Sequence, residues 1–355
     1  MLKTCRAVIL KLERTTMTSL RSAFASATAI VTFSLTVPAA SWAEQPIPVV
    51  ATFSILGDMV KRIGGEHIAL TTLVGPDGDA HVYQPTPKAA RSVAEADVLF
   101  MNGLEFEGWL ERLAEAASFD GAKVVATKGI VPIAFDEHDD DDDHDDHDKK
   151  DDHDDHDDHD DHDKKDDHDD HDDHAGHDHG TFDPHAWQSL ENAVIYANNI
   201  AAGLAQADPS NAGDYYTNRA TFVDEIAALK SEIDAMMASL PADKRTVVTP
   251  HDAFGYFAVA YNLKFEAPQG MSTESEVSAA DVAALITQIR RENISAVFIE
   301  SITDNRMMEQ IANETGASIG GTLYSDALSD ENGPASTYLK MMHHNAKTLS
   351  DALGS

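Results

Sequence analysis

The stretch "IPVVATFSILGDMVKRIGGEHIALTTLVG" (residues 47–75) places one amphipathic segment between two apolar runs. The runs 47–54 and 68–74 are short and apolar, which is typical of buried strands. The segment 55–65 has helical periodicity and ends at a glycine. A strand, a helix and a second strand in this order predict a parallel sheet covered by helices.

The same alternation continues along the chain. It predicts helices at 86–96, 106–117, 252–262, 278–293, 303–316 and 335–353, and strands at 97–103, 123–129, 244–251, 294–301 and 317–325. Residues 211–240 keep apolar side chains on one helical face, which predicts a single helix about 45 Å long. We therefore expect an α/β protein with two lobes, 44–210 and 241–355, each a parallel sheet flanked by helices. The long rigid helix 211–240 would join them.

The N-terminus has the pattern of an export signal. Basic residues precede a small, apolar run at 23–40, and "SWA" (41–43) has the small residues that a signal peptidase requires. We predict a signal peptide at 1–43, cleaved near Ala43, with either Met1 or Met17 as the start. A membrane anchor is the alternative. Cys5 is the sole cysteine and lies in the removed part, so we expect a mature periplasmic chain without disulfide or lipid anchor.

Acidic residues are concentrated in one low-complexity segment. The chain has a formal net charge of −36, and residues 136–179 hold 26 acidic residues against 4 lysines, which is −22 of that charge. We predict a disordered loop at 136–180, because such a composition cannot bury a core. Its histidines predict an accessory, low-affinity metal-binding loop, with a dispensable solvated insert as the alternative; they are His138, His144, His147, His153, His156, His159, His162, His168, His171, His174, His177 and His179. The acidic balance argues against nucleic acid as a partner.

Four side chains follow predicted strands or lie in loops where ligands bind in open α/β sheets: His81, His185, His251 and Asp326. Three imidazoles and one carboxylate would make a tetrahedral Zn²⁺ site. Each residue also has an ordinary interpretation, since His81 could be a surface residue, His185 a helix-start neighbour, His251 a local hydrogen-bonding group and Asp326 a turn cap. It is their joint placement that favours metal binding.

The sequence pattern does not decide the role of three other polar and aromatic residues. Glu107, Tyr83 and Trp187 could either line a cleft or pack in the core. The remaining histidines outside the acidic segment are interpreted as surface residues; they are His67, His343 and His344.

The motifs "GDAHVYQPTP", "NGLEFEGWL", "DPHAW", "TPHDAFGYFA" and "GTLYSDAL" resemble the metal-binding subunit of bacterial zinc- and manganese-uptake ABC transporters, the cluster A-I solute-binding proteins. The resemblance covers about residues 46–355 and implies that His81, His185, His251 and Asp326 bind metal. Histidine at 251 and a His/Asp-rich insert are what the resemblance associates with the zinc branch. The chain departs from some zinc members in lacking a second-lobe disulfide and in having Ala80 before His81.

The resemblance implies high-affinity Zn²⁺ capture in the periplasm and delivery to a membrane permease, with ATP hydrolysis by a separate cytoplasmic subunit. We expect a monomer and no enzyme activity, and a periplasmic zinc chaperone is a further candidate partner. The chain has no G-x-x-x-x-G-K-[ST] motif of its own. The alternatives are an exported zinc-dependent hydrolase, a Zn²⁺ buffer acting through the His/Asp-rich loop, and Mn²⁺ as the metal.

Overall fold

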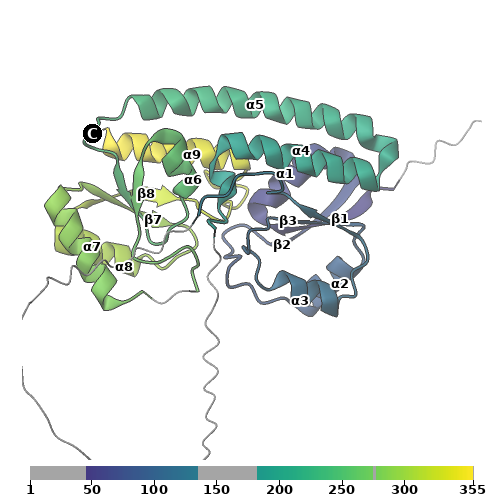
Figure 1. Ribbon diagram of the computed structural model, residues 1–355, viewed down its shortest axis with the longest axis horizontal. Helices are drawn as coiled ribbons and strands as arrows, with labels where there is room; N and C mark the ends of the chain where they lie inside the picture. Colours follow the sequence, from purple (N-terminus) through teal and green to yellow (C-terminus); the bar gives the residue numbers. More distant parts are fainter. Residues whose placement is uncertain (1–44, 135–181, 275–276, 355) are drawn as a thin grey trace, which may run out of the picture. The chain divides into compact units, whose positions relative to one another are not determined.

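The computed structural model describes residues 45–134, 182–274 and 277–354 (Figure 1). All described residues belong to one compact unit, Glu44–Ser355. The predicted signal peptide 1–43 and the His/Asp-rich loop 136–180 with its twelve histidines lie outside the described residues. Within the described ranges, no helix combines the length and the apolar character needed to cross a membrane.

The first sheet is parallel and has the order β2-β1-β3-β4. Its strands are β1 (Ile47–Phe53), β2 (Ile68–Val74), β3 (Val98–Met101) and β4 (Ala122–Val125). The helices between them are α1 (Ser54–Gly64), α2 (Pro87–Ala94) and α3 (Leu110–Ala116). Strand β1 is almost wholly buried because it is central and covered on both faces.

The second sheet repeats this design with the order β6-β5-β7-β8. Its strands are β5 (Thr246–Val248), β6 (Lys264–Glu266), β7 (Ala296–Glu300) and β8 (Ser318–Leu323). Its helices are α6 (Gly255–Tyr261), α7 (Ala279–Glu292), α8 (Arg306–Thr315) and α9 (Tyr338–Leu353). The prediction of two parallel sheets flanked by helices is confirmed. Strand β6 was not predicted, because its three residues form no apolar run.

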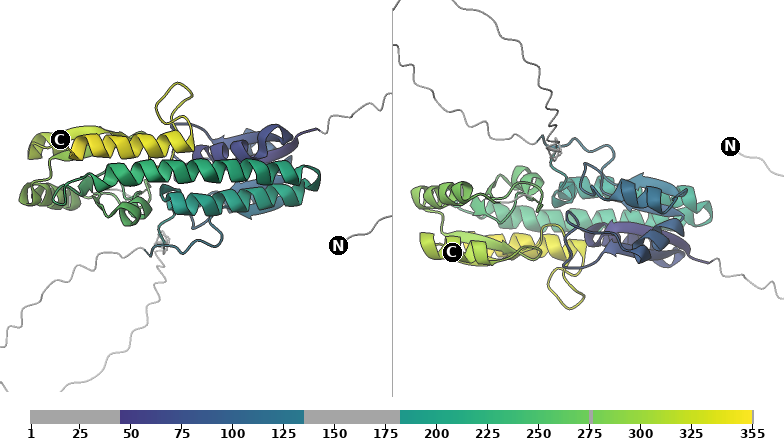
Figure 2. Two further views of the ribbon diagram at one scale, coloured as in Figure 1. Left: turned by 90° about the horizontal axis from the view of Figure 1, so that it is seen from above. Right: turned by 90° about the horizontal axis from the view of Figure 1, so that it is seen from below.

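Two long helices lie between the sheets in sequence. Helix α4 (Leu190–Ala207) starts at Ser189, whose side chain accepts a hydrogen bond from Asn192 N, and a short turn at 209–211 separates it from α5 (Ala212–Ala238). Helix α5 packs against α1 and α4 beside the first sheet and against α9 and α6 beside the second. Figures 1 and 2 show it running past both sheets. Its buried residues lie on one face, as predicted; they are Tyr215, Phe222, Ile226, Leu229, Ile233 and Met237.

The chain after β8 returns to the first sheet before it enters α9. Leu328 N donates to Ser54 Oγ at 2.9 Å, and Leu328 O accepts from Asp77 N at 2.9 Å. Tyr338 N, at the start of α9, donates to Asp58 Oδ2 at 2.9 Å. These bonds hold the end of the second lobe against α1 and the loop after β2, so the segment that carries Asp326 lies between the two sheets.

Candidate metal centre

The four predicted ligands come together at one point between the two sheets. His81 lies in the loop after β2, His185 in the turn before α4, His251 just beyond β5, and Asp326 just beyond β8. One imidazole nitrogen from each histidine and a carboxylate oxygen of Asp326 all lie within 4.8 Å of one another. Two elements from each half of the chain therefore supply the cluster.

The distances from Asp326 to the three histidines are close to those between the ligands of a tetrahedral ion. Asp326 Oδ2 is 3.2 Å from His81 Nε2 and 3.3 Å from His251 Nε2, and Oδ1 is 3.6 Å from His185 Nε2. Ligands at about 2.0–2.1 Å from a Zn²⁺ ion in a tetrahedron lie roughly 3.3 Å apart. The spacing of these four groups is therefore compatible with one shared metal ion.

The facing atoms are withdrawn from solvent and lack hydrogen-bond partners. His185, His251 and Asp326 are fully buried, and the His81 side chain is 6% exposed. Among the described residues, the three Nε2 atoms and both Asp326 oxygens belong to the buried polar atoms without a hydrogen-bond partner. Because an unpaired buried polar group is costly, five such atoms pointing at one place indicate a missing common partner.

The imidazole of His185 is held by the residue two positions before it. Asp183 Oδ1 accepts from both the backbone N and the ring Nδ1 of His185, each at 2.8 Å. Tyr256 OH from α6 donates to Asp183 O at 3.0 Å. Gly255 lets this aspartate approach closely, because a Cβ at position 255 would clash with Asp183 Oδ2. A carboxylate on Nδ1 fixes the tautomer that leaves Nε2 free for a metal.

His251 has an equivalent carboxylate from a different strand. Glu300, the last residue of β7, is 1% exposed, and its Oε2 lies 2.7 Å from His251 Nδ1. Its Oε1 accepts from the backbone N of His251 at 3.2 Å. Glu300 therefore orients both the ring and the backbone of this ligand.

The other two ligands are fixed by backbone contacts and packing. His81 N donates to Asp79 Oδ1 at 2.9 Å, and its ring meets Phe106 edge to face at 4.8 Å between centroids. The carbonyl before Asp326 accepts from Trp187 Nε1 and Gln188 Nε2, each at 2.8 Å. All four predicted ligands are thus held in defined positions by their surroundings.

Charge interactions inside the cluster displace the pKa values of its members. Burial alone lowers the pKa of His251, but Glu300 and Asp326 outweigh it and raise that pKa well above the usual value. Burial also opposes a charged His185, yet Asp326 and Asp183 raise its pKa. Burial raises the pKa of Asp326, whereas His185 and His251 outweigh burial and hold it well below its usual range. The charges of His185, His251 and Asp326 therefore stabilise one another inside the buried centre.

Glu107, which the sequence left open, is a buried support and not one of the converging groups. Its carboxylate accepts from Thr52 Oγ1 at 2.6 Å, Asn102 N at 2.7 Å and Gly103 N at 3.2 Å. Burial raises the pKa of Glu107, which these hydrogen bonds oppose. Asn102 Nδ2 in turn donates to Pro184 O at 2.9 Å, beside His185. The network therefore fixes the turn that carries a ligand.

The two aromatic residues left open both pack in this region. Trp187 is fully buried, with its ring 5.3 Å from that of His185. Tyr83 packs against Trp109 at 4.8 Å between centroids. Neither contributes a converging atom to the cluster.

The supporting carboxylates Asp183 and Glu300 were not singled out from the sequence. Asp183 was visible inside "DPHAW", and Glu300 as an acid ending the apolar run "ISAVFIES". An acidic residue at the end of a buried strand is a usable signal, but which histidine it meets depends on strand order.

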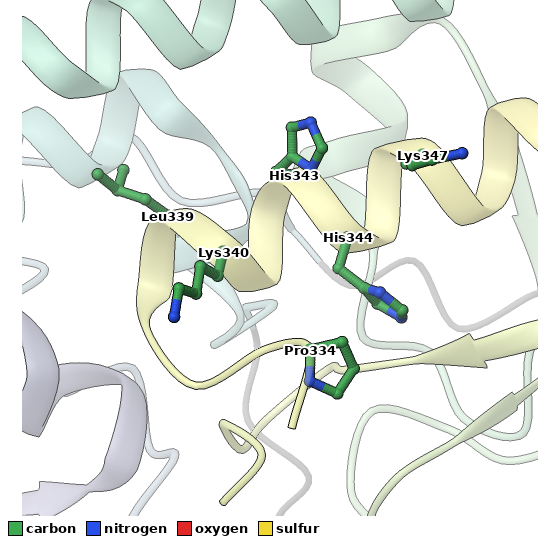
Figure 3. Close-up of a pocket in the computed structure, with 6 residues that line it drawn as sticks. All are labelled: Pro334, Leu339, Lys340, His343, His344 and Lys347. Carbon is green, nitrogen blue, oxygen red and sulfur yellow. The ribbon is translucent and has the colours of Figure 1, made fainter. Parts of the chain in front are cut away.

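The three remaining histidines lie outside the cluster. His67 Nε2 pairs with Asp214 at 2.8 Å on the surface. His343 and His344 point to different sides of α9, beside a hollow that they line with Pro334, Leu339, Lys340 and Lys347 (Figure 3). His344 is half-buried, as His67 is, and its ring lies 5.4 Å from that of Tyr324.

Comparison with known proteins identifies the family. The family model described as the periplasmic zinc-uptake complex component A matches residues 49–352. The chain belongs to this family. The predicted resemblance to periplasmic metal-binding proteins of ABC transporters is thereby confirmed.

Relatives in this family are named for different metals. The iron-binding protein YfeA of Yersinia pestis is 30% identical, over 92% of this chain and 94% of its own length. The manganese ABC transporter substrate-binding lipoprotein PsaA of Streptococcus mitis is 28% identical, over 87% and 90%. The periplasmic zinc-binding protein TroA of Treponema pallidum has a solved structure with a TM-score of 0.72 and 26% identity, covering 87% of this chain and 99% of TroA. Similarity to these relatives alone therefore does not identify which metal this chain binds.

Proposed function

We propose that this chain captures Zn²⁺ in the periplasm at His81, His185, His251 and Asp326 and delivers it to the permease of an ABC importer. The observation that carries the proposal is the convergence of three unpaired Nε2 atoms on one buried carboxylate, with edges of 3.2–3.6 Å. Family membership supports the transport role, since the relatives are substrate-binding proteins of ABC transporters.

The donor set favours zinc over manganese. Imidazole nitrogen suits Zn²⁺, whereas Mn²⁺ prefers carboxylate, carbonyl and water oxygen. This cluster offers three nitrogens and one carboxylate, and its carboxylates at Asp183 and Glu300 face the far side of the rings, at Nδ1. We therefore infer a zinc site, although relatives are named for manganese and iron.

The same geometry disfavours a hydrolase. A catalytic zinc keeps one position for water or substrate beside three protein ligands. Here Asp326 faces all three imidazoles, so four protein groups would complete a tetrahedron. A closed, buried site suits an ion that is carried and not used in chemistry.

The assignment is tested in cells that lack the chromosomal copy of this gene. We expect poor growth under metal chelation, restored by the intact gene or by added Zn²⁺ but not by added Mn²⁺. The His251→Ala variant should fail to restore growth, whereas the surface variant His67→Ala should succeed. Rescue by Mn²⁺ and not by Zn²⁺ would overturn the zinc assignment. Full restoration by His251→Ala would overturn the site.

A further inference from the structure

One carboxylate outside the four converging groups connects a ligand loop to the opposite lobe. Asp79 Oδ1 accepts from the backbone N of His81 at 2.9 Å. Its Oδ2 accepts from Thr273 Oγ1 at 2.6 Å. Thr273 belongs to the segment between β6 and α7 of the second lobe. A single side chain thus joins the backbone of one ligand to the other side of the centre.

We propose that the Asp79–Thr273 hydrogen bond is a latch across the opening of the metal centre and sets how fast a bound ion escapes. In this role Asp79 is a positioning residue and does not itself coordinate the ion. The proposal rests on the proposed function, because it concerns release of the ion from the same four ligands.

The burial of the ligands locates the opening. His185, His251 and Asp326 have no exposed surface, whereas the His81 side chain keeps 6%. The residue after it, Val82, is 46% exposed. His81 is therefore the most solvent-exposed of the four groups, and Asp79 connects its loop to Thr273.

Several bonds between the two halves close to the metal centre are buried more deeply than this one. Trp187 and Gln188, which donate to Ser325 O, are fully buried, and Tyr256, which donates to Asp183 O, is 5% exposed. Asp79 and Thr273 are only half-buried. A bond that water can reach opens more readily than bonds inside the core, so the Asp79–Thr273 bond can break while the buried bonds of Trp187, Gln188 and Tyr256 stay intact.

The Thr273 segment has local bonds that do not depend on the latch. Gln269 Nε2 donates to Thr273 O at 3.0 Å, and Ser272 Oγ accepts from Glu274 N at 3.2 Å. Asp252 N also donates to Gln269 O at 3.2 Å, next to the ligand His251. We therefore expect the segment to keep its place beside His251 when the hydroxyl of Thr273 is removed. A substitution of that hydroxyl then removes the bond to Asp79 without displacing the segment.

The test is the rate of metal release from the mature full-length chain. The wild type, Thr273→Val, Thr273→Ser and the control Thr287→Val are each loaded with one equivalent of Co²⁺ and mixed with excess chelator, and the loss of the Co²⁺ absorption is followed. Thr287 supplies a matched control because its hydroxyl donates to Ala283 O within α7. Loss of a hydrogen bond to a charged group predicts about tenfold faster release for Thr273→Val.

The expected pattern has three parts. Thr273→Val releases Co²⁺ at least threefold faster with an unchanged Co²⁺ spectrum, Thr273→Ser and Thr287→Val behave as wild type, and Thr273→Val adds nothing in an Asp79→Ala background. Release within threefold of wild type, or an altered spectrum in Thr273→Val, overturns the latch. Failure of the wild type to take up one equivalent would instead overturn the proposed function.

Discussion

Glu300 should control both the affinity of the centre for Zn²⁺ and its dependence on pH. Its oxygens lie 2.7 Å from Nδ1 and 3.2 Å from the backbone N of His251, and both side chains are buried from solvent that would screen them. Losing the outer partner of a metal-bound histidine costs about 10–100-fold in affinity, or roughly 1.4–2.8 kcal/mol. Glu300→Gln keeps the shape and an acceptor, so we expect about tenfold, with Glu300→Ala nearer about a hundredfold.

The pH dependence gives the second half of this prediction. Burial lowers the pKa of His251, but Glu300 and then Asp326 raise it well above its usual value, so a proton competes with the metal in the wild type. Removing the charge of Glu300 lowers that pKa, and Zn²⁺ affinity should then change less steeply between about pH 7 and 9, above the ordinary histidine pKa.

The assay is competition for Zn²⁺ against a chromogenic chelator at several pH values, with Glu309→Gln as a control on the exposed face of α8. An affinity within threefold of wild type for Glu300→Ala at pH 8 would refute the reasoning. An unchanged pH slope would refute its electrostatic part.

Three further results are expected. Zn²⁺ binding at pH 7 should release at least one proton per ion, because the pKa values of His185 and His251 are raised; equal calorimetric enthalpies in buffers of different ionisation enthalpy would contradict this. The raised pKa of His251 stabilises the metal-free fold fully below about pH 6.5, and this contribution is lost as pH rises through the folded-state pKa. The melting temperature of the chelator-treated protein should therefore fall as the pH rises above about 6.5, and it should fall less in the Glu300→Gln variant. A wild-type melting temperature that falls no more steeply with pH than that of Glu300→Gln would count against this. Gly255→Ala should push Asp183 away from His185 and weaken Zn²⁺ binding about tenfold, and Asp183→Asn should have a similar effect. Gly213→Ala, where an added Cβ meets nothing, should leave binding unchanged.

Much of the fold could be predicted from the sequence because its strands are buried. Runs such as 47–54 and 294–301 are apolar enough to mark central strands, and the helix at 211–240 showed its buried face through Phe222 and Ile226. Strand β6 lacked that signal, since Lys264–Glu266 is short and half-exposed. The return of the chain after β8 to α1 also has no local signal, because it depends on contacts such as Leu328 with Ser54.

The candidate site was predictable for a different reason. Parallel strands bring their carboxyl ends to one edge, so polar residues after several strands are expected to meet there. What could not be predicted is which acid supports which histidine. Asp183 reaches His185 within one turn, but Glu300 reaches His251 only because β5 and β7 are neighbours in the sheet.

The most direct test of the central claim is a Zn²⁺ titration of the mature chain lacking residues 138–179, beside the same variant carrying His251→Ala. The convergence of three imidazoles on Asp326 predicts one tight equivalent in the first protein, and its loss or strong weakening in the second. If removing 138–179 alone abolished tight binding, the His/Asp-rich segment would be the metal site. The cluster between the two sheets would then lose its assigned role.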